Sequence, residues 1–169
     1  MTAPRARSSL RRFQPTDLHP IKRLILDTID LSYARDYPPR AVAFFKTFHA
    51  EQEILARSQA GSVLVIAEHD GEENGELIGT GSLVQGEILA VFVHPRHQRG
   101  GHGKALMHAL ENEARASGAT EVRLSVSLPS RRFYQSLGYR LVEACSRDVG
   151  DGQRLDFWKA EKRLTPLKP

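Results

Sequence analysis

The spacing of hydrophobic and polar positions changes repeatedly along the chain, and each change predicts a helix or a strand. Between residues 18 and 29 the apolar residues recur every three or four positions, as on one face of an amphipathic helix. A second helix is predicted to begin near Arg40, in a region that Gly61 ends. Similar spacing predicts helices at 104–117 and 129–137, each followed by a glycine. Apolar runs or alternating positions predict strands at 8–14, 63–67, 76–84, 88–93, 122–126, 139–149 and 154–161.

Tight turns join most of these strands. Polar turns are expected at 70–75 and 85–86, and Asp151-Gly152 predicts a hairpin between the last two strands. Strands joined in this way are antiparallel, whereas a helical crossover makes strands 88–93 and 122–126 parallel. We therefore predict an α/β (α+β) fold, in which a mixed, mostly antiparallel sheet of six to seven strands carries helices on both faces.

Length and composition indicate a single globular domain. The chain has 169 residues, and we expect a domain at 10–164 between a basic tail at 1–9 and a short tail at 165–169. With 40% hydrophobic and 26% charged residues, the chain has no apolar run of membrane-spanning length and lacks the apolar core of a secretion signal. Cys145 is the single cysteine, so we expect a reducing, cytoplasmic location without an internal disulfide.

The stretch from Ile88 to Met107 joins an apolar run, a glycine-rich turn and the start of a helix. The unbroken run 88–93 is typical of a central strand covered on both faces. Three glycines between Gln98 and Lys104 allow a ligand to approach the backbone closely. Because a strand that leads through such a turn into a helix N-terminus forms an anion site, the sequence predicts binding of a phosphate or pyrophosphate here.

Comparison of this turn with known phosphate-binding loops narrows the choice of ligand. A Walker loop is excluded because Gln98 and Ala105 replace its first glycine and its hydroxyl residue, and Leu106 replaces the third glycine of the dinucleotide fingerprint. The pattern that fits is Q-x-x-G-x-G, carried by Gln98, Gly101 and Gly103. This pattern resembles the acetyl-CoA loop of the GNAT N-acetyltransferase superfamily, although a strand-turn-helix without a ligand stays an alternative.

A second motif strengthens the resemblance. Residues 131–140, RRFYQSLGYR, are similar to the closing F-Y-x-x-L-G-[FY] motif of the same family. Together the two motifs and the element order resemble a complete GNAT fold over residues 10–164. The resemblance implies acetyl-CoA as co-substrate, without a metal, and transfer of its acetyl group to a primary amine by direct attack in a ternary complex. An alternative is a non-catalytic acyl-CoA-binding regulatory module.

The resemblance also implies which residues hold the cofactor. The backbone of Val91, Phe92 and Val93 would pair with the pantetheine arm, and the Val91 N–H would donate to the thioester oxygen. Ser127 and Ser130 stand where the family often has asparagine and alanine, so Ser127 would offer the pantetheine one hydrogen bond from a side chain of shorter reach. The pyrophosphate loop would consist of Gln98, Arg99, Gly100, Gly101, His102, Gly103 and Lys104.

Two residues are candidates for proton transfer. Tyr134 matches the family tyrosine that protonates the CoA thiolate, and helical geometry turns it about 100° away from Phe133, the alternative being a core aromatic. Glu87 lies where some members carry a glutamate base, and otherwise it would be a solvated turn residue. Ordered water and His94 are the other candidates for the base.

The acceptor is less well defined by the residues. In the family its specificity comes from the segment between the first two helices and from the last hairpin. Tyr33, Asp36 and Tyr37 could receive a cationic amine by cation–π contact and ion pairing, or they could be ordinary surface residues. The acceptor could therefore be a small-molecule amine or a peptide amine. The donor could carry a longer acyl group, and the protein could form a homodimer.

A cluster of arginines could suggest a nucleic-acid partner, and a cluster of histidines could suggest a metal ion. We expect neither partner to be bound. The first cluster is predicted to be a solvated tail rather than a nucleic-acid arm, because no aromatic residues lie among its charges; it comprises Arg5, Arg7, Arg11 and Arg12. Four histidines around the glycine loop lack cysteines and i, i+4 spacing, so we expect no metal site. They are His94, His97, His102 and His108.

Overall fold

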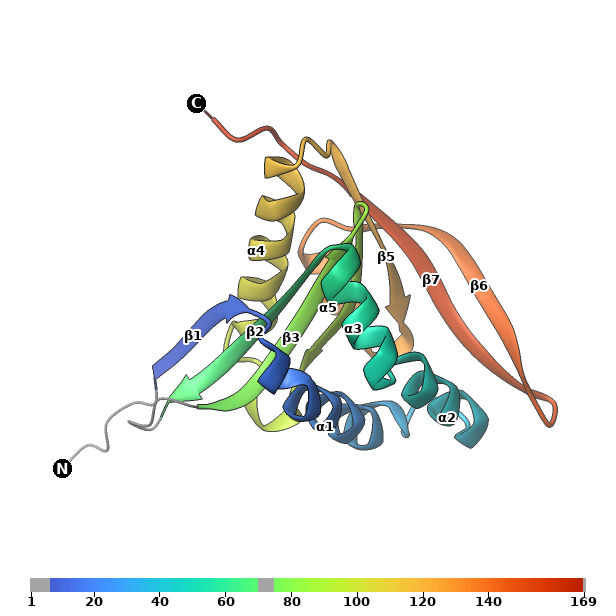
Figure 1. The fold of residues 1–169 in the computed structure, drawn as a ribbon. Coiled ribbons are helices and arrows are strands. Elements are labelled where there is room, and N and C mark those ends of the chain that lie inside the picture. Colours follow the sequence, from blue (N-terminus) through green and yellow to red (C-terminus); the bar gives the residue numbers. More distant parts are fainter. Residues whose placement is uncertain (1–6, 70–74, 169) are drawn as a thin grey trace.

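The computed structural model describes residues 7–69 and 75–168 (Figure 1). The polar turn predicted at 70–75 therefore lies, apart from Gly75, outside the described residues, as does Arg5. In chain order the strands and main helices are β1 Arg7–Arg12, α1 Leu18–Thr28, α2 Pro39–Phe48, α3 Glu51–Ala60, β2 Ser62–His69, β3 Glu76–Val84, β4 Glu87–Val93, α4 His102–Ala116, β5 Glu121–Ser127, α5 Arg131–Ser136, β6 Arg140–Gly150 and β7 Gln153–Arg163. A π-helical turn, Ile29–Tyr33, continues α1.

The seven strands form one sheet in the order β1-β2-β3-β4-β5-β7-β6. Every neighbouring pair is antiparallel except β4 and β5, which are parallel as the crossover through α4 predicts. The predicted mixed, mostly antiparallel fold is confirmed. The last strand, β7, lies next to β5 and leaves β6 at the edge of the sheet.

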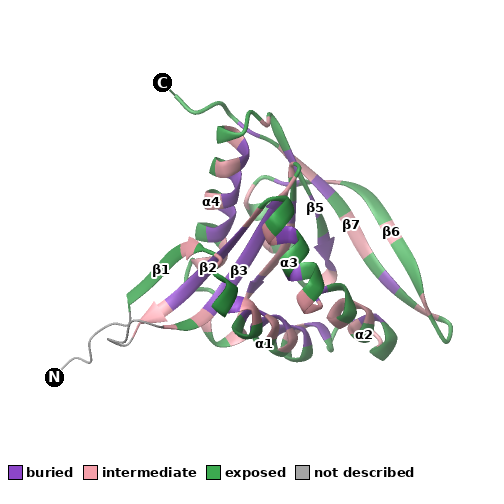
Figure 2. Ribbon diagram, viewed as in Figure 1, coloured by how far each residue is buried: buried purple, intermediate pink, exposed green. Residues whose placement is uncertain are grey.

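Different helices cover the two faces of the sheet. Leu106, Met107 and Leu110 of α4 are fully buried on one face, whereas Ile21 and Ile25 of α1 are buried on the other. Their spacing of three and four residues explains why each helix buries a single stripe. Figure 2 shows buried positions concentrated in β2, β3 and the inner side of α4, whereas β6 is mostly exposed and β7 mixes buried, intermediate and exposed positions. No helix in the described ranges is both long and apolar enough to cross a bilayer.

The region predicted as one second helix consists of two helices. His49, with φ −109° and ψ 32°, ends α2, and Ala50 is extended before α3 begins at Glu51. The His49 ring turns inward and packs edge to face on Phe92, with 5.0 Å between ring centroids. The break coincides with this tertiary contact, at a place where the sequence contains neither glycine nor proline.

The arginines expected in a solvated N-terminal tail are largely part of the sheet. β1 begins at Arg7 and pairs with β2 along its whole length. Arg11 forms an ion pair with Asp17 at 2.7 Å, and Arg12 forms one with Glu113 at 2.9 Å. Burial acts to raise the pKa of Asp17, but hydrogen bonds from Arg11 and from the Gln14 N–H outweigh it and lower that pKa below its usual value.

Candidate active site

A gap between β4 and β5 lies at the centre of the candidate site. The two strands pair only at Glu87 with Arg123 and at Ile88 with Leu124, and then they diverge. Ala90, with φ 54°, forms a bulge against β3. The segment 89–93 of β4 therefore has a backbone edge that faces the gap. Its apolar residues are mostly half-buried rather than covered on both faces, because they line cavities.

The first cavity, called the loop cavity, has a volume of about 350 Å³ and lies between the end of β4, the start of α4 and α5. Val91, Phe92 and Val93 line one side of it. Of the predicted loop residues, five line the cavity, whereas Gly100 and His102 do not. The five are Gln98, Arg99, Gly101, Gly103 and Lys104.

The backbone of the loop is held in a shape that suits an anion. The Gln98 side chain donates a hydrogen bond to the Val93 carbonyl at 3.0 Å, which ties the turn to the end of β4. Arg99 and Gly101 have φ values of 65° and 85°. The helical hydrogen bond from the Ala105 N–H to the Gly101 carbonyl is 3.0 Å long, so the three N–H groups before Ala105 precede the regular ladder of α4. Two cationic side chains and the helix dipole give this end of the cavity a positive potential.

The second cavity, called the sheet cavity, has a volume of about 200 Å³ and lies between α2, β4 and the β6–β7 hairpin. Seven of its lining residues are phenylalanine or tyrosine, namely Tyr33, Phe44, Phe45, Phe48, Phe92, Tyr134 and Phe157. Among the residues that line it, Glu87 is the one carboxylate and Arg147 the one guanidinium. Sequence reasoning missed the α2 aromatics and Arg147, because apolar helical spacing is read as core and an arginine on a strand as surface.

The two cavities meet at a common wall. Five residues line both of them: Tyr33, Val91, Phe92, Ser130 and Tyr134. Tyr134 and Val91, predicted on separate grounds, are therefore brought together at the junction. Ser127 lines the sheet cavity but not the loop cavity.

Tyr134 presents an unpaired hydroxyl to this junction. The residue is 7% exposed, and its ring packs against Phe133 and Tyr139 with centroid separations of 5.0 and 5.8 Å. Within the described part of the chain its hydroxyl has no hydrogen-bond partner. Burial, with a smaller effect of Tyr33, raises the pKa of Tyr134 above its usual value, so the phenol keeps its proton at neutral and moderately alkaline pH.

The three residues predicted to receive the acceptor have different positions. Tyr33 lines both cavities and accepts a hydrogen bond from Ser127 at 3.2 Å. Tyr37 is 6% exposed and holds the chain together, because its hydroxyl donates to the Asp156 carbonyl at 2.7 Å and accepts from the Leu128 N–H at 2.9 Å. Asp36 is exposed. Neither Tyr37 nor Asp36 lines the loop cavity or the sheet cavity.

Two histidines also differ in whether they line a cavity. His94, the reserve base, lies outside both cavities, and its Nδ1 accepts a hydrogen bond from the Arg96 N–H at 3.2 Å. His49 lines the sheet cavity and is 6% exposed. Burial and the nearby Arg57 charge lower the pKa of His49 to about 3, so its ring is neutral at physiological pH. Within the described ranges, no three His, Cys, Asp or Glu residues are grouped to hold a metal ion.

Comparison with known proteins identifies the family. The family model described as acetyltransferase (GNAT) domain matches residues 33–152. The peptidyl-lysine N-acetyltransferase YiaC of Escherichia coli is 35% identical over 81 residues, which cover 46% of this chain and 52% of YiaC. The match therefore spans about half of that relative's length.

Solved structures share the fold. A GCN5-related N-acetyltransferase from Rhodopseudomonas palustris has a TM-score of 0.80 at 23% identity, with 97% of this chain and 99% of that chain covered. The PaiA N-acetyltransferase from Thermoplasma acidophilum, in complex with coenzyme A, has a TM-score of 0.71 at 20% identity, with coverage of 94% and 99%. Since the family model spans more than half of the residues, this chain belongs to the GNAT acetyltransferases.

Proposed function

We propose that this protein transfers the acetyl group of acetyl-CoA to a primary amine by direct attack in a ternary complex. The observation that carries the proposal is the junction of the loop and sheet cavities at Val91 and Tyr134, because two reactants that enter separately can meet there. Membership of the acetyltransferase family and the coenzyme A bound to the Thermoplasma relative support acyl-CoA as the donor.

The loop cavity has the chemistry that an acyl-CoA requires. N–H groups at the start of α4, with Arg99 and Lys104, suit a pyrophosphate. The backbone edge of β4 suits the amide groups of a pantetheine arm, which need extended hydrogen-bonding partners. Ser130 lines this cavity and Ser127 does not, so Ser130 is the serine expected to contact the donor.

Three groups assist the reaction, two at the junction and Glu87 on the wall of the sheet cavity. The amine nitrogen bonds to the acetyl carbon while the carbon–sulfur bond of the thioester breaks. The Val91 N–H donates to the carbonyl oxygen as negative charge develops on it, and the Tyr134 hydroxyl gives its proton to the departing thiolate. Glu87 takes the proton from the amine, directly or through a water molecule.

The proposal is tested by calorimetric titration with acetyl-CoA, comparing wild type with Gly101→Glu and Gly118→Glu. The two glycines bound the same helix with similar φ values of 85° and 88°, and a Cβ added at either meets no atom within 4 Å. Backbone strain is therefore matched, and only Gly101→Glu adds a negative charge at the loop cavity. Binding that is lost in Gly101→Glu and kept in Gly118→Glu supports the proposal, followed by acetylation of a panel of amines. Wild type that binds no acetyl-CoA refutes it.

A further inference from the structure

Arg147 is a cation at the sheet cavity without an ion-pair partner in the described residues. It lies on β6 opposite Leu155, and therefore on the same face of the hairpin as the cavity residues Leu155 and Phe157. Its guanidinium carbon is 4.9 Å from the centre of the Phe44 ring of α2. Stacking on this ring fixes the guanidinium over the aromatic wall and leaves its N–H donors for another group.

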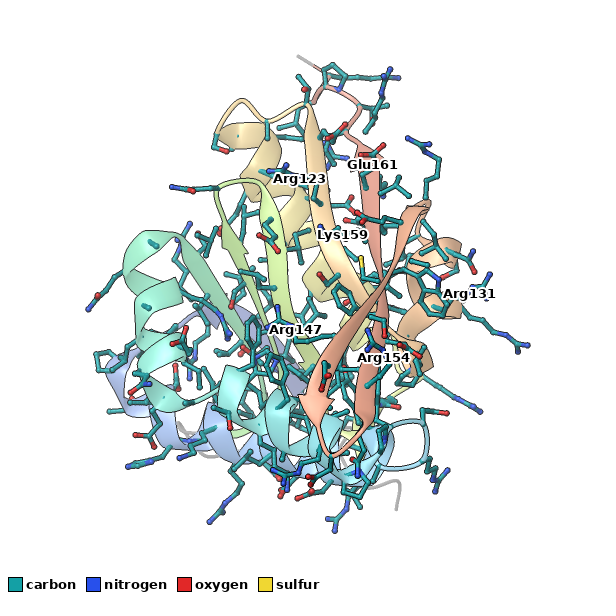
Figure 3. The ribbon with its side chains drawn as sticks, turned by 90° about the vertical axis from the view of Figure 1, so that its right-hand side faces the viewer. Arg123, Arg131, Arg147, Arg154, Lys159 and Glu161 are labelled. Carbon is teal, nitrogen blue, oxygen red and sulfur yellow. The ribbon has the colours of Figure 1, made fainter. Side chains whose placement is uncertain are left out.

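The glutamates on this face of the hairpin lie farther along it and pair with other cations. Glu143 is paired with Lys159 at 3.6 Å, and Glu161 is paired with Arg140. Figure 3 shows the charged side chains of this region, with Lys159 and Glu161 farther along the hairpin than Arg147. An anion that enters the sheet cavity therefore finds a free guanidinium at its edge.

The opposite charge lines another part of the same cavity. Glu87 starts β4, and within the described residues it forms no ion pair, although Arg123 stands next to it in register on β5. The other lining residues are mostly aromatic or aliphatic, with His49 and three serines among them. The cavity thus offers a carboxylate, an apolar surface and a guanidinium in one small volume of about 200 Å³.

We propose that the acceptor is a small zwitterionic amine, namely an amino acid with an apolar side chain. Its carboxylate is bound by Arg147, its side chain packs on the aromatic wall, and its amino group is directed toward Glu87 and the junction at Tyr134. This inference rests on the proposed acetyltransferase function. A polycationic amine is disfavoured, because the cavity offers it one carboxylate and a repelling guanidinium.

The test compares L-phenylalanine with 2-phenylethylamine, which has the same ring and amine but lacks the carboxylate. Initial rates with acetyl-CoA are measured for wild type, Arg147→Gln and the matched control Arg154→Gln. Arg154 is an exposed arginine on the opposite face of the same hairpin, where it donates to Ser146 at 2.7 Å. Both variants remove one positive charge, so a general electrostatic effect is common to them.

We expect wild type to prefer L-phenylalanine in kcat/KM by roughly tenfold, because an exposed charge-assisted pair contributes modestly. Arg147→Gln should abolish this ratio and Arg154→Gln should keep it. A change in α2 packing affects both acceptors alike and cancels in the ratio. The inference is overturned if the ratio survives in Arg147→Gln, or if 2-phenylethylamine, spermidine or a lysine peptide is the better acceptor.

Direct binding separates this inference from the proposed function. L-phenylalanine is titrated calorimetrically into the protein saturated with coenzyme A. If acetyl-CoA binds but L-phenylalanine neither binds nor is acetylated, the zwitterion inference fails and the acetyltransferase proposal stands. If acetyl-CoA does not bind, the proposed function fails, and with it this inference.

Discussion

The hydroxyl of Tyr134 faces the junction of the two cavities and forms no hydrogen bond with the described residues, so its removal breaks no contact within the protein. Tyr134→Phe is therefore expected to leave the melting temperature unchanged or slightly higher. Without the proton donor, kcat should fall by about 100-fold while the Kd for acetyl-CoA stays the same. Steady-state kinetics and calorimetry check this, and a non-catalytic acyl-CoA-binding module would lose nothing.

Tyr139→Phe is the matched control for this experiment. The Tyr139 hydroxyl donates to the buried Glu111 at 2.9 Å, so its loss should lower the free energy of unfolding by about 1–3 kcal/mol. It lines neither cavity, and kcat should be unchanged. If Tyr134→Phe behaves like Tyr139→Phe, the role of Tyr134 is structural.

His49 predicts a pH-dependent stability. Its pKa is about 3 in the folded protein and near 6.5 when unfolded, so between these values the unfolded chain binds a proton that the folded protein does not. The free energy of unfolding should consequently fall as pH drops below 6.5, by up to about 1.4 kcal/mol per pH unit. Asp17, whose pKa is lowered from 3.8, acts only at more acidic pH.

Urea unfolding of wild type, His49→Leu and His108→Gln between pH 5 and pH 7 measures this effect. His108 is exposed, and its replacement should retain the wild-type slope. The slope should vanish in His49→Leu. Equal slopes in all three proteins would show that His49 is not the titrating group.

Individual site residues could be predicted where a local rule determined them. Helical geometry turned Tyr134 away from the face of its neighbour, and the glycine pattern indicated the loop. Tyr33 and Tyr37 were expected either to receive a cationic amine or to be ordinary surface residues. Their burial depends on Ser127, Leu128 and Asp156, which lie far along the chain and which no local pattern reveals.

At the scale of elements, Tyr37 joins the end of β5 to β7 and so positions one wall of the sheet cavity. Tyr37→Phe removes two hydrogen bonds, and we expect a loss of about 1–3 kcal/mol in the free energy of unfolding. KM for the acceptor should rise, while acetyl-CoA affinity, which depends on the loop cavity, should not change. Chemical unfolding and calorimetry test both expectations.

The control is Arg40→Gln, which removes an exposed ion pair with Asp151 at the hairpin tip. Such pairs contribute at most about 1 kcal/mol, so stability should change little. A loss of acetyl-CoA affinity in Tyr37→Phe as large as the change in acceptor KM would contradict the separation of the two cavities.

The elements with strong periodicity or turn signals were predictable, including the Asp151-Gly152 hairpin and the parallel pairing across α4. The division of the second helix was not. No helix-breaking residue lies at His49, and only the acidic Glu51 and Glu53 in the first turn of α3 hint at a new N-terminus. The gap between β4 and β5 could not be predicted from the residues, because an apolar run looks the same whether it faces core or cavity.

For the whole molecule, separate cavities predict sequential kinetics without an acetylated enzyme. Double-reciprocal plots at several acetyl-CoA concentrations should intersect, and the mass of the protein should not increase on incubation with acetyl-CoA alone. Cys145 lines neither cavity, so Cys145→Ser should keep full activity. Parallel lines, or an acetyl adduct lost in Cys145→Ser, would contradict direct transfer.

The bulge at Ala90 and the short pairing of β4 with β5 leave an unpaired stretch of strand inside the molecule instead of at its rim. Unpaired strands at a rim attract strands of other molecules and promote aggregation. Here the pairing at Ile88 closes one end of the stretch, and helices flank it. A slender extended molecule can add itself to this sheet as a removable strand.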